Sequence, residues 1–242
     1  MVRIVHASKD ENGRYTNGIA GDQTGQEVCM RTWYNRPWDT VLRPLDKTLG
    51  NKIASVAQIL AKCERIGYDQ YQRTTLYDQC AAIGWDISKI DQISPCECDC
   101  SSFIAVILGF CGVSVPKTIY TGNMTAALLA TGKFLCLRDS KYLTGDNYLE
   151  KGDIVLNTAH HVAVVLDDGT RAAQPFVAYA AQVAVNTYLQ VRTSPGGAEY
   201  RLPDGQSYRL PNGMTVAILQ EAQGWGRLSD IQGWVSLSYL RR

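Results

Sequence analysis

The chain has 242 residues, with 24 basic and 23 acidic side chains and a formal net charge of +1. Hydrophobic residues make up 45% and charged residues 19%, which is ordinary globular composition and excludes a disordered chain. The balanced charge also excludes the concentrated basic surface of a nucleic-acid-binding protein, so we expect no nucleic-acid partner. This length allows one large domain or two small ones.

The N-terminal residues give no sign of an export signal, because residues 1–15 lack the apolar core of a signal peptide. The longest apolar run, residues 103–113, is shorter than the roughly 20 residues that cross a bilayer. We therefore expect no membrane span and a chain that folds in the cytoplasm, or a mature form whose leader has been removed. The eight cysteines are irregularly spaced, which favours reduced thiols.

The predicted elements of the first part of the chain are mostly helices. Residues 1–50 contain short strand-like pieces between loops rich in Gly, Asn and Asp, and they match no domain pattern. Apolar spacing and end signals predict helices over residues 51–65, 74–83, 101–110 and 122–131. Strands are expected over residues 152–156 and 161–166, with a third near 171–178. Helices followed by a small antiparallel sheet indicate an α+β domain.

The pattern changes in the last quarter of the chain, where short alternating segments are separated by Pro and Gly turns. This is typical of a small all-β barrel. We place the boundary within residues 180–187, which gives a first domain over 1–182 and a second over 186–242. The expected strands of the second domain cover residues 188–192, 208–210, 214–220, 225–228 and 233–235.

Cys100 is the candidate nucleophile, because it stands immediately before the apolar helix expected over residues 101–110. The positive end of a helix dipole lowers the pKa of a thiol there, and the thiolate is the reactive form. The free N–H groups of the same first turn, at Cys100 and Ser101, are suited to holding an oxyanion.

A cysteine nucleophile needs a base, and the chain offers only three histidines: His6, His160 and His161. His161 opens an apolar strand, a rigid position from which an imidazole can face a helix terminus. For the third group, which orients the imidazole, Gln174 on the following strand is our candidate and Asn157 its rival.

Two other interpretations of these residues stay open. Cys100 can be an inert packing residue at the start of a buried helix. Cys96, Cys98 and Cys100 can also form a zinc site with His160 and His161. The zinc spacing found in structural sites is a two-residue gap repeated at a distance, and no second cysteine pair follows here. We therefore predict a site without metal or cofactor.

The stretch from Asp99 through Phe103, continued by residues 111–118, resembles the NlpC-type cell-wall cysteine peptidases. The resemblance extends to Gly152-Asp153 and to His161-Val162-Ala163, and covers roughly residues 50–180. Where that family has a glycine after Asp-Cys-Ser, this chain has Ser102. The related CHAP amidases and peptidases use the same Cys–His catalytic mechanism. The resemblance implies a papain-like catalytic domain without metal that acts on peptidoglycan. It also implies substrate-binding roles for Asp99, Ser101 and Tyr68.

The C-terminal stretch resembles a bacterial SH3-like wall-binding domain through its Gly-Trp and Leu-Pro-Asn-Gly segments. Trp225 is the candidate for stacking on ligand, while at least one of Trp225 and Trp234 is expected in the core. The two halves together resemble a phage or prophage endolysin. Such an enzyme waits in the cytoplasm until a membrane pore releases it, and it then hydrolyses an amide bond of the wall peptide. The alternatives are an N-acetylmuramoyl-L-alanine amidase with the same site and a non-catalytic wall-binding protein.

Overall fold

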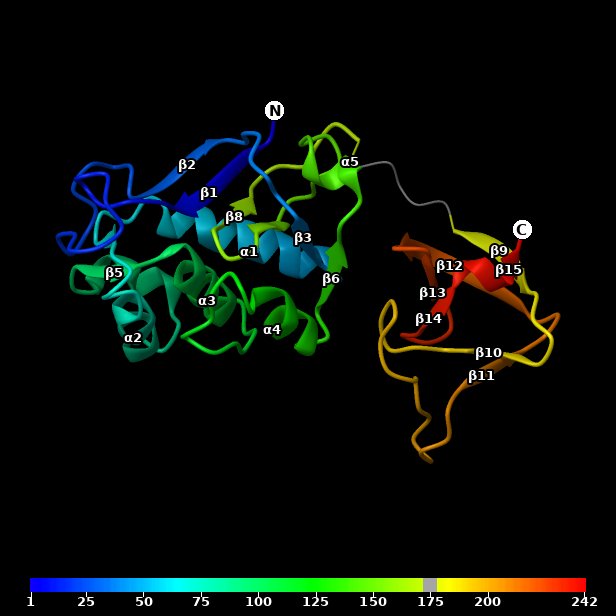
Figure 1. The fold of residues 1–242 in the computed structure, drawn as a ribbon. Helices are drawn as coiled ribbons and strands as arrows, with labels where there is room; N and C mark the ends of the chain where they lie inside the picture. Colours follow the sequence, from blue (N-terminus) through cyan, green and yellow to red (C-terminus); the bar gives the residue numbers. More distant parts are fainter. Residues whose placement is uncertain (172–177) are drawn as a thin grey trace. The chain divides into compact units, whose positions relative to one another are not determined.

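The computed structural model describes residues 1–171 and 178–242, and the chain divides into two compact units, Met1–Ala173 and Gln174–Arg242 (Figure 1). This division lies earlier than the boundary expected within residues 180–187. The reason is strand β9 (Tyr179–Val183), which pairs with strands of the second unit and therefore belongs to it. The third strand expected near residues 171–178 falls almost entirely outside the described residues.

A six-stranded antiparallel sheet forms the centre of the first unit, in the order β2-β1-β8-β7-β3-β6. Residues 1–50 supply three of its strands, so this segment is part of the domain (Figure 1). The strands are β1 (Arg3–Ala7), β2 (Val28–Thr32), β3 (Thr40–Pro44), β6 (Phe134–Leu137), β7 (Ile154–Asn157) and β8 (His161–Val165).

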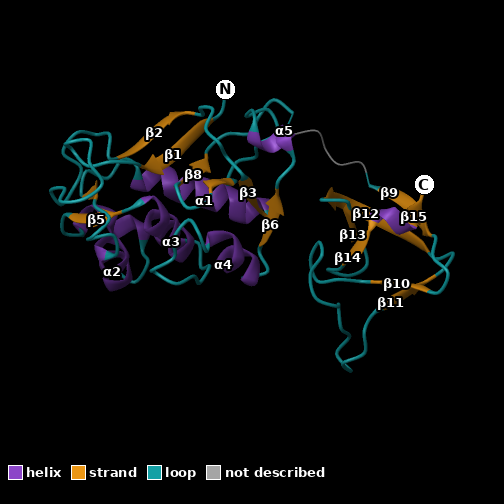
Figure 2. Ribbon diagram, viewed as in Figure 1, coloured by secondary structure: helices purple, strands orange, loops and turns teal. Residues whose placement is uncertain are grey.

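Helices gather on one side of this sheet, where α1 and α3 contact β8 (Figure 2). The four helices predicted from the sequence are present with their ends shifted by a few residues. A short 3-10 helix, Ile87–Gln92, and a one-turn helix, α5 (Ser140–Leu143), were not predicted. The predicted helices are α1 (Lys47–Leu60), α2 (Thr75–Ala82), α3 (Cys100–Phe110) and α4 (Met124–Ala130).

Helix α3 is the most buried of the helices, since every residue except Gly109 is buried. A Cβ at Gly109 would lie 2.5 Å from the Trp85 ring, so only glycine fits there. The Gly152-Asp153 motif also has a structural basis. Gly152 has φ +90°, and a Cβ there would lie 2.3 Å from the carbonyl oxygen of Gly50. Asp153 is fully buried and forms an ion pair of 2.7 Å with Arg43 on β3.

A short parallel pair sits beside α3 and fixes a tyrosine near it. Strand β4 (Ile66–Tyr68) pairs with β5 (Cys96–Cys98), and in this register Tyr68 is opposite Cys98. Tyr68 is therefore held next to the start of α3, although Tyr68 and Cys100 are 32 positions apart in the sequence.

The second unit contains a five-stranded sheet in the order β14-β13-β12-β9-β15 and a separate pair, β10–β11. Within the described residues these sheets are open and do not close into the expected barrel. Turn residues located most strands correctly, but the pairing of β9 with the C-terminal β15 was not visible in the local pattern. The remaining strands are β10 (Tyr188–Gln190), β11 (Arg209–Pro211), β12 (Thr215–Ala222), β13 (Trp225–Leu228), β14 (Trp234–Ser236) and β15 (Leu240–Arg241).

The chain as a whole is therefore a mixed helix-and-strand protein whose larger sheets are antiparallel. Among the described residues, no helix combines the length and apolar character needed to cross a bilayer.

Candidate functional site

Cys100 is the first residue of α3, and its side chain is buried, with 7% of its surface exposed. Asp99 caps the helix, because its Oδ1 accepts from the N–H groups of Ser101 (2.9 Å) and Ser102 (2.7 Å). Ser102 Oγ in turn accepts from the N–H of Asp99 at 2.9 Å, which completes a capping box. Ser102, the departure from the NlpC-type pattern, thus stabilises the turn that carries Cys100.

His161 lies beside this helix terminus as the first residue of β8. Helix α3 packs against β8, and the N–H of Val162, the next residue, faces the Cys100 thiol. The indole of Trp38 stacks on the His161 ring, with centroids 6.2 Å apart and an angle of 29° between the planes. The Cys100 thiol therefore lies beside the start of β8, next to the backbone of the residue that follows His161. The catalytic pairing of Cys100 with His161 stays a prediction.

The partner of the His161 imidazole is His6, a residue that the sequence analysis did not select. His6 Nδ1 lies 2.8 Å from His161 Nε2, and both rings are buried. Strand β1 pairs with β8, which aligns the two histidines on neighbouring strands. The contact could not be predicted from local motifs, because the two residues are 155 positions apart in the sequence. The features that could have pointed to His6 were the scarcity of histidine in the chain and the strand-like run around His6.

The two residues expected in this third position have different outcomes. Gln174 lies outside the described residues. Asn157 ends β7 opposite His161, and its backbone oxygen accepts from the N–H of His160 at 3.0 Å. The side chain beside Nε2 of His161 is nevertheless that of His6. The physical reason is that β1 lies against the other edge of β8, a pairing that the sequence pattern did not reveal.

Burial sets the protonation states of Cys100 and His161. It raises the pKa of the Cys100 thiol to about 11, and the Asp99 carboxylate adds to the effect. The helix-dipole argument predicted a lowered pKa, so that expectation is wrong for the resting site. Burial also lowers the pKa of His161 to about 3, with further contributions from His6, Arg36 and Arg31. The resting pair is therefore a neutral thiol and a neutral imidazole.

Tyr68, Asp99 and Ser101 all lie near the thiol. Burial and the neighbouring Cys100 raise the pKa of Tyr68 well above its usual range, so its hydroxyl keeps its proton. Gln70 Nε2 donates to the Tyr68 hydroxyl oxygen at 3.2 Å. Ser101 Oγ lies 3.8 Å from Cys100 Sγ, but only 2% of Ser101 is exposed.

The Asp99 carboxylate is already engaged within the protein. Its Oδ2 lies 2.7 Å from Arg73 Nε, and Arg73 Nη2 donates to Oδ1 at 3.3 Å. Arg73 Nη2 also donates to the carbonyl oxygen of Ile119. The Asp99 carboxylate therefore positions the helix terminus, and its expected role in substrate binding stays a prediction.

A cavity of about 470 Å³ opens beside the histidines. Its wall includes His6, His161 and Tyr68, so a ligand in it would lie against the site. Cys100 is not among the residues that line it. The remaining lining residues are Ser8, Lys9, Tyr15, Arg31, Tyr34, Arg36, Gln70, Ala159 and His160.

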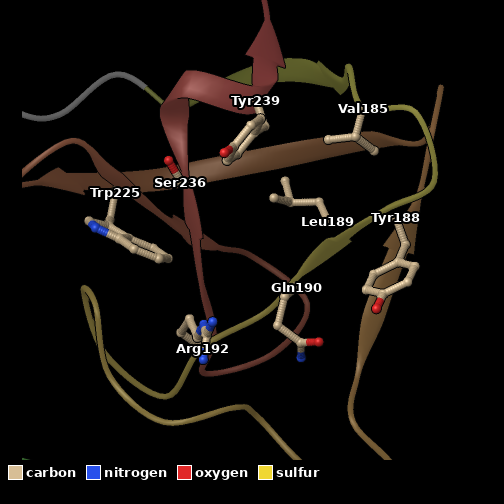
Figure 3. A pocket seen from close by; sticks show the side chains of 8 residues that line it. All are labelled: Val185, Tyr188, Leu189, Gln190, Arg192, Trp225, Ser236 and Tyr239. Carbon is tan, nitrogen blue, oxygen red and sulfur yellow. The ribbon is translucent and has the colours of Figure 1, made fainter.

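A second cavity, of about 350 Å³, lies in the C-terminal unit (Figure 3). Trp225 and Tyr188 line it from opposite ends, and Tyr239 lies between them (Figure 3). Arg192 and Gln190 add polar groups. Trp234, by contrast, is only 3% exposed and belongs to the core, which leaves Trp225 as the tryptophan available to a ligand.

No group of three or more His, Cys, Asp or Glu side chains in the described residues is arranged to hold a metal ion. The zinc alternative does not fit the two cysteines before Cys100. The Cys96 thiol donates to the carbonyl oxygen of Arg65 at 3.5 Å, and the Cys98 thiol donates to that of Gly67 at 3.6 Å. All eight cysteines are free.

Comparison with known proteins gives one family. The model of the endolysin-like domain matches residues 4–172, whereas no curated protein and no solved structure matches the chain. The matched range includes His6, Cys100 and His161 and ends where the second unit begins. An endolysin-like domain indicates a lytic action on the bacterial cell wall, with peptidoglycan as the substrate class. Because the match covers most of the chain and contains the whole site, this protein belongs to the endolysin-like domain family.

Proposed function

We propose that the first unit is a papain-like cysteine hydrolase that cuts an amide bond in the peptide part of peptidoglycan. The observation that carries the proposal is the contact between His6 Nδ1 and His161 Nε2, beside the helix terminus that holds Cys100. With Cys100 as nucleophile, His161 as base and His6 as orienting group, the site would hold the three groups that acyl transfer requires. Such a hydrolase needs no metal or cofactor.

The tautomers of the two histidines decide the direction of proton transfer. We assign the shared proton to His161 Nε2, so that it donates to His6 Nδ1 and leaves His161 Nδ1 unprotonated and free to act as base. As Cys100 Sγ bonds to the carbonyl carbon of the substrate, Nδ1 takes the thiol proton. Nδ1 then gives that proton to the leaving amine, and the acyl-enzyme forms. Water, deprotonated by Nδ1, releases the acyl group and restores the thiol.

Two groups are suited to hold the oxyanion of the tetrahedral intermediate. The N–H of Ser101 is already bonded to Asp99, which removes it from the pair expected from the sequence. The N–H of Cys100 has no partner among residues 1–171 and 178–242. The Tyr68 hydroxyl accepts from Gln70 and retains its own proton for donation. We therefore assign the oxyanion to Cys100 N–H and Tyr68 O–H.

The proposal is tested by replacing Cys100 with alanine in the full chain and following the clearing of a cell-wall suspension. We expect the lytic rate to fall by at least about 10³-fold. Cys111→Ala is the matched control, because Cys111 is a half-buried free cysteine at the other end of α3. Unchanged lysis by Cys100→Ala would contradict the mechanism and favour a non-catalytic wall-binding protein.

The bond that is cut decides between a peptidase and an amidase, which can use the same Cys–His chemistry. Mass spectrometry of fragments released from a defined peptidoglycan separates the two. A new N-terminal L-alanine would identify an N-acetylmuramoyl-L-alanine amidase. A cut within the stem peptide or the cross-bridge would identify the endopeptidase that we favour.

For the C-terminal unit we propose an SH3-like role in wall binding through the cavity that Trp225 lines. Aromatic rings flanking polar groups suit a peptide or sugar segment of the wall. The test is sedimentation of the Cys100→Ala chain with insoluble wall, with and without Trp225→Ala. Loss of co-sedimentation in the double variant is expected, and full retention would exclude this cavity as the wall contact.

The proposed enzyme is a phage or prophage endolysin.

A further inference from the structure

The cavity beside the catalytic histidines is positively charged. Three of its lining residues are cations, Lys9, Arg31 and Arg36, and none of its lining residues is an Asp or a Glu. Elsewhere in the described part of the chain, several Arg and Lys side chains form ion pairs with carboxylates, as Arg43 does with Asp153. A wall with three cations and no acid is complementary to an anion.

The two arginines are held over aromatic rings that contact the histidines. The Arg31 guanidinium lies 4.3 Å from the centre of the Tyr34 ring, and that ring lies 6.3 Å from His6. The Arg36 guanidinium lies 6.0 Å from the Trp38 ring, which stacks on His161. Each guanidinium is thus positioned by a cation–π contact one ring away from a catalytic histidine.

One side-chain nitrogen of the two arginines lacks a hydrogen-bond acceptor. Arg36 Nε is buried and has no hydrogen-bond partner among the described residues. A buried N–H without an acceptor is destabilising, and a ligand oxygen would satisfy it. A guanidinium binds a carboxylate through two parallel hydrogen bonds, so its preferred ligand has this chemistry.

We propose that Arg31 and Arg36 form a subsite for a free carboxylate of the peptide substrate, next to the amide bond that Cys100 attacks. This subsite rests on the proposed hydrolysis of peptidoglycan and specifies which peptides it accepts. Stem peptides offer such a group in two places, the α-carboxylate of the D-glutamyl residue and the C-terminal carboxylate. The shared chemistry is the carboxylate, and amidation removes it from either place.

Charge coupling supports the placement. Arg31 and Arg36 both lower the pKa values of His6 and His161, so their positive charge reaches the catalytic pair. A carboxylate bound between the arginines would offset that charge and make His161 a stronger base. Binding of the correct substrate would therefore strengthen the group that removes the thiol proton.

The experiment measures binding by calorimetry to the full-length Cys100→Ala chain, in which turnover is blocked. Three synthetic stem pentapeptides are compared: one with free carboxylates, one amidated at D-glutamate, and one amidated at the C-terminus. The free peptide is expected to bind at least about 10-fold more tightly than one of the two amidated forms. The amidated position that weakens binding identifies the carboxylate.

Variants then test the arginines in the same background. The Arg36→Gln variant is expected to bind the free peptide about 10-fold more weakly than the parent chain does, and to bind all three peptides with equal affinity. Arg65→Gln is the control, because it removes the same charge at an exposed residue that lies outside the cavity wall. Retention of the carboxylate preference in Arg36→Gln would overturn the subsite, as would an equal effect of Arg65→Gln or equal binding of all three peptides by the parent chain.

The result is independent of the hydrolysis test. If the Cys100→Ala chain still clears cell walls but binds the free peptide selectively, the thiol mechanism fails and the carboxylate subsite stands. If Cys100→Ala abolishes lysis but amidation and Arg36→Gln change nothing, the mechanism stands and the subsite is excluded.

Discussion

His6 Nδ1 and His161 Nε2 are 2.8 Å apart, although the two residues lie 155 positions apart in the chain. The contact depends on the pairing of β1 with β8, which places Val5 opposite Val164 in the register. A strand from the start of the chain therefore completes a site whose other members come from its middle. The family match also begins in β1, at residue 4, and so includes His6.

The contact predicts that His6 is needed for the correct tautomer of His161. His6→Ala should reduce kcat/KM for wall hydrolysis on the order of 10²-fold, because Nε2 of His161 loses the acceptor that keeps its proton there. His6→Asn should recover part of the rate, since an amide oxygen can accept the same hydrogen bond. Turbidity clearing by purified variants measures this. A larger loss in Asn157→Ala than in His6→Ala would contradict the assignment.

The local part of the site could be predicted from the sequence, and the long-range part could not. Cys100 and His161 stand in short motifs whose helix-start and strand-start positions follow from neighbouring residues. His6 has no such motif, because its role arises from pairing between strands far apart in sequence. The C-terminal unit shows the same limit, since β9 and β15 pair across nearly the whole unit.

Burial is the second property that the sequence did not reveal. The helix terminus at Cys100 suggested a lowered thiol pKa, but only 7% of the residue is exposed and desolvation dominates. Ser102 illustrates the opposite case. It looked like a departure from the family pattern, and in the structure it completes the cap of α3.

Tyr68 is predicted to act in the transition state rather than in substrate binding. Tyr68→Phe removes only the hydroxyl, so kcat should fall on the order of 10²-fold while KM changes little. Steady-state kinetics on a soluble muropeptide separates the two constants. Tyr71→Phe, at an exposed tyrosine nearby, is the control and should leave both unchanged. A rise in KM at constant kcat in Tyr68→Phe would instead indicate a binding role.

Glu97 should make the protein less stable as the pH rises. Its side chain is buried, and both carboxylate oxygens lack partners among the described residues. Burial, followed by repulsion from Glu27, raises its pKa to about 8. The folded state therefore binds a proton that the unfolded state releases above its ordinary pKa of 4.5. The contribution of this group to stability is therefore fully present below about pH 4.5 and is lost as the pH rises through about 8.

The prediction for Glu97 is checked with Glu97→Gln, which cannot ionise. Urea unfolding at pH 5 and pH 8 should show that the variant gains stability relative to the wild type as the pH rises. Glu64→Gln, at an exposed position, should follow the wild type at both values. An unchanged difference between Glu97→Gln and the wild type from pH 5 to pH 8 would show that Glu97 ionises normally in the folded protein.

Breaking the buried ion pair between Arg43 and Asp153 should cost far more stability than breaking the exposed pair between Arg3 and Asp167. Asp153 is fully buried and lies 2.7 Å from Arg43, which joins β3 to the start of β7. Asp153→Asn leaves the buried guanidinium without its main counter-charge, so the free energy of unfolding should fall by about 3 kcal/mol. Asp167→Asn, which breaks the exposed pair with Arg3, should leave it nearly unchanged. Denaturant titration of both variants measures the difference, and equal losses would show that burial does not govern these pairs.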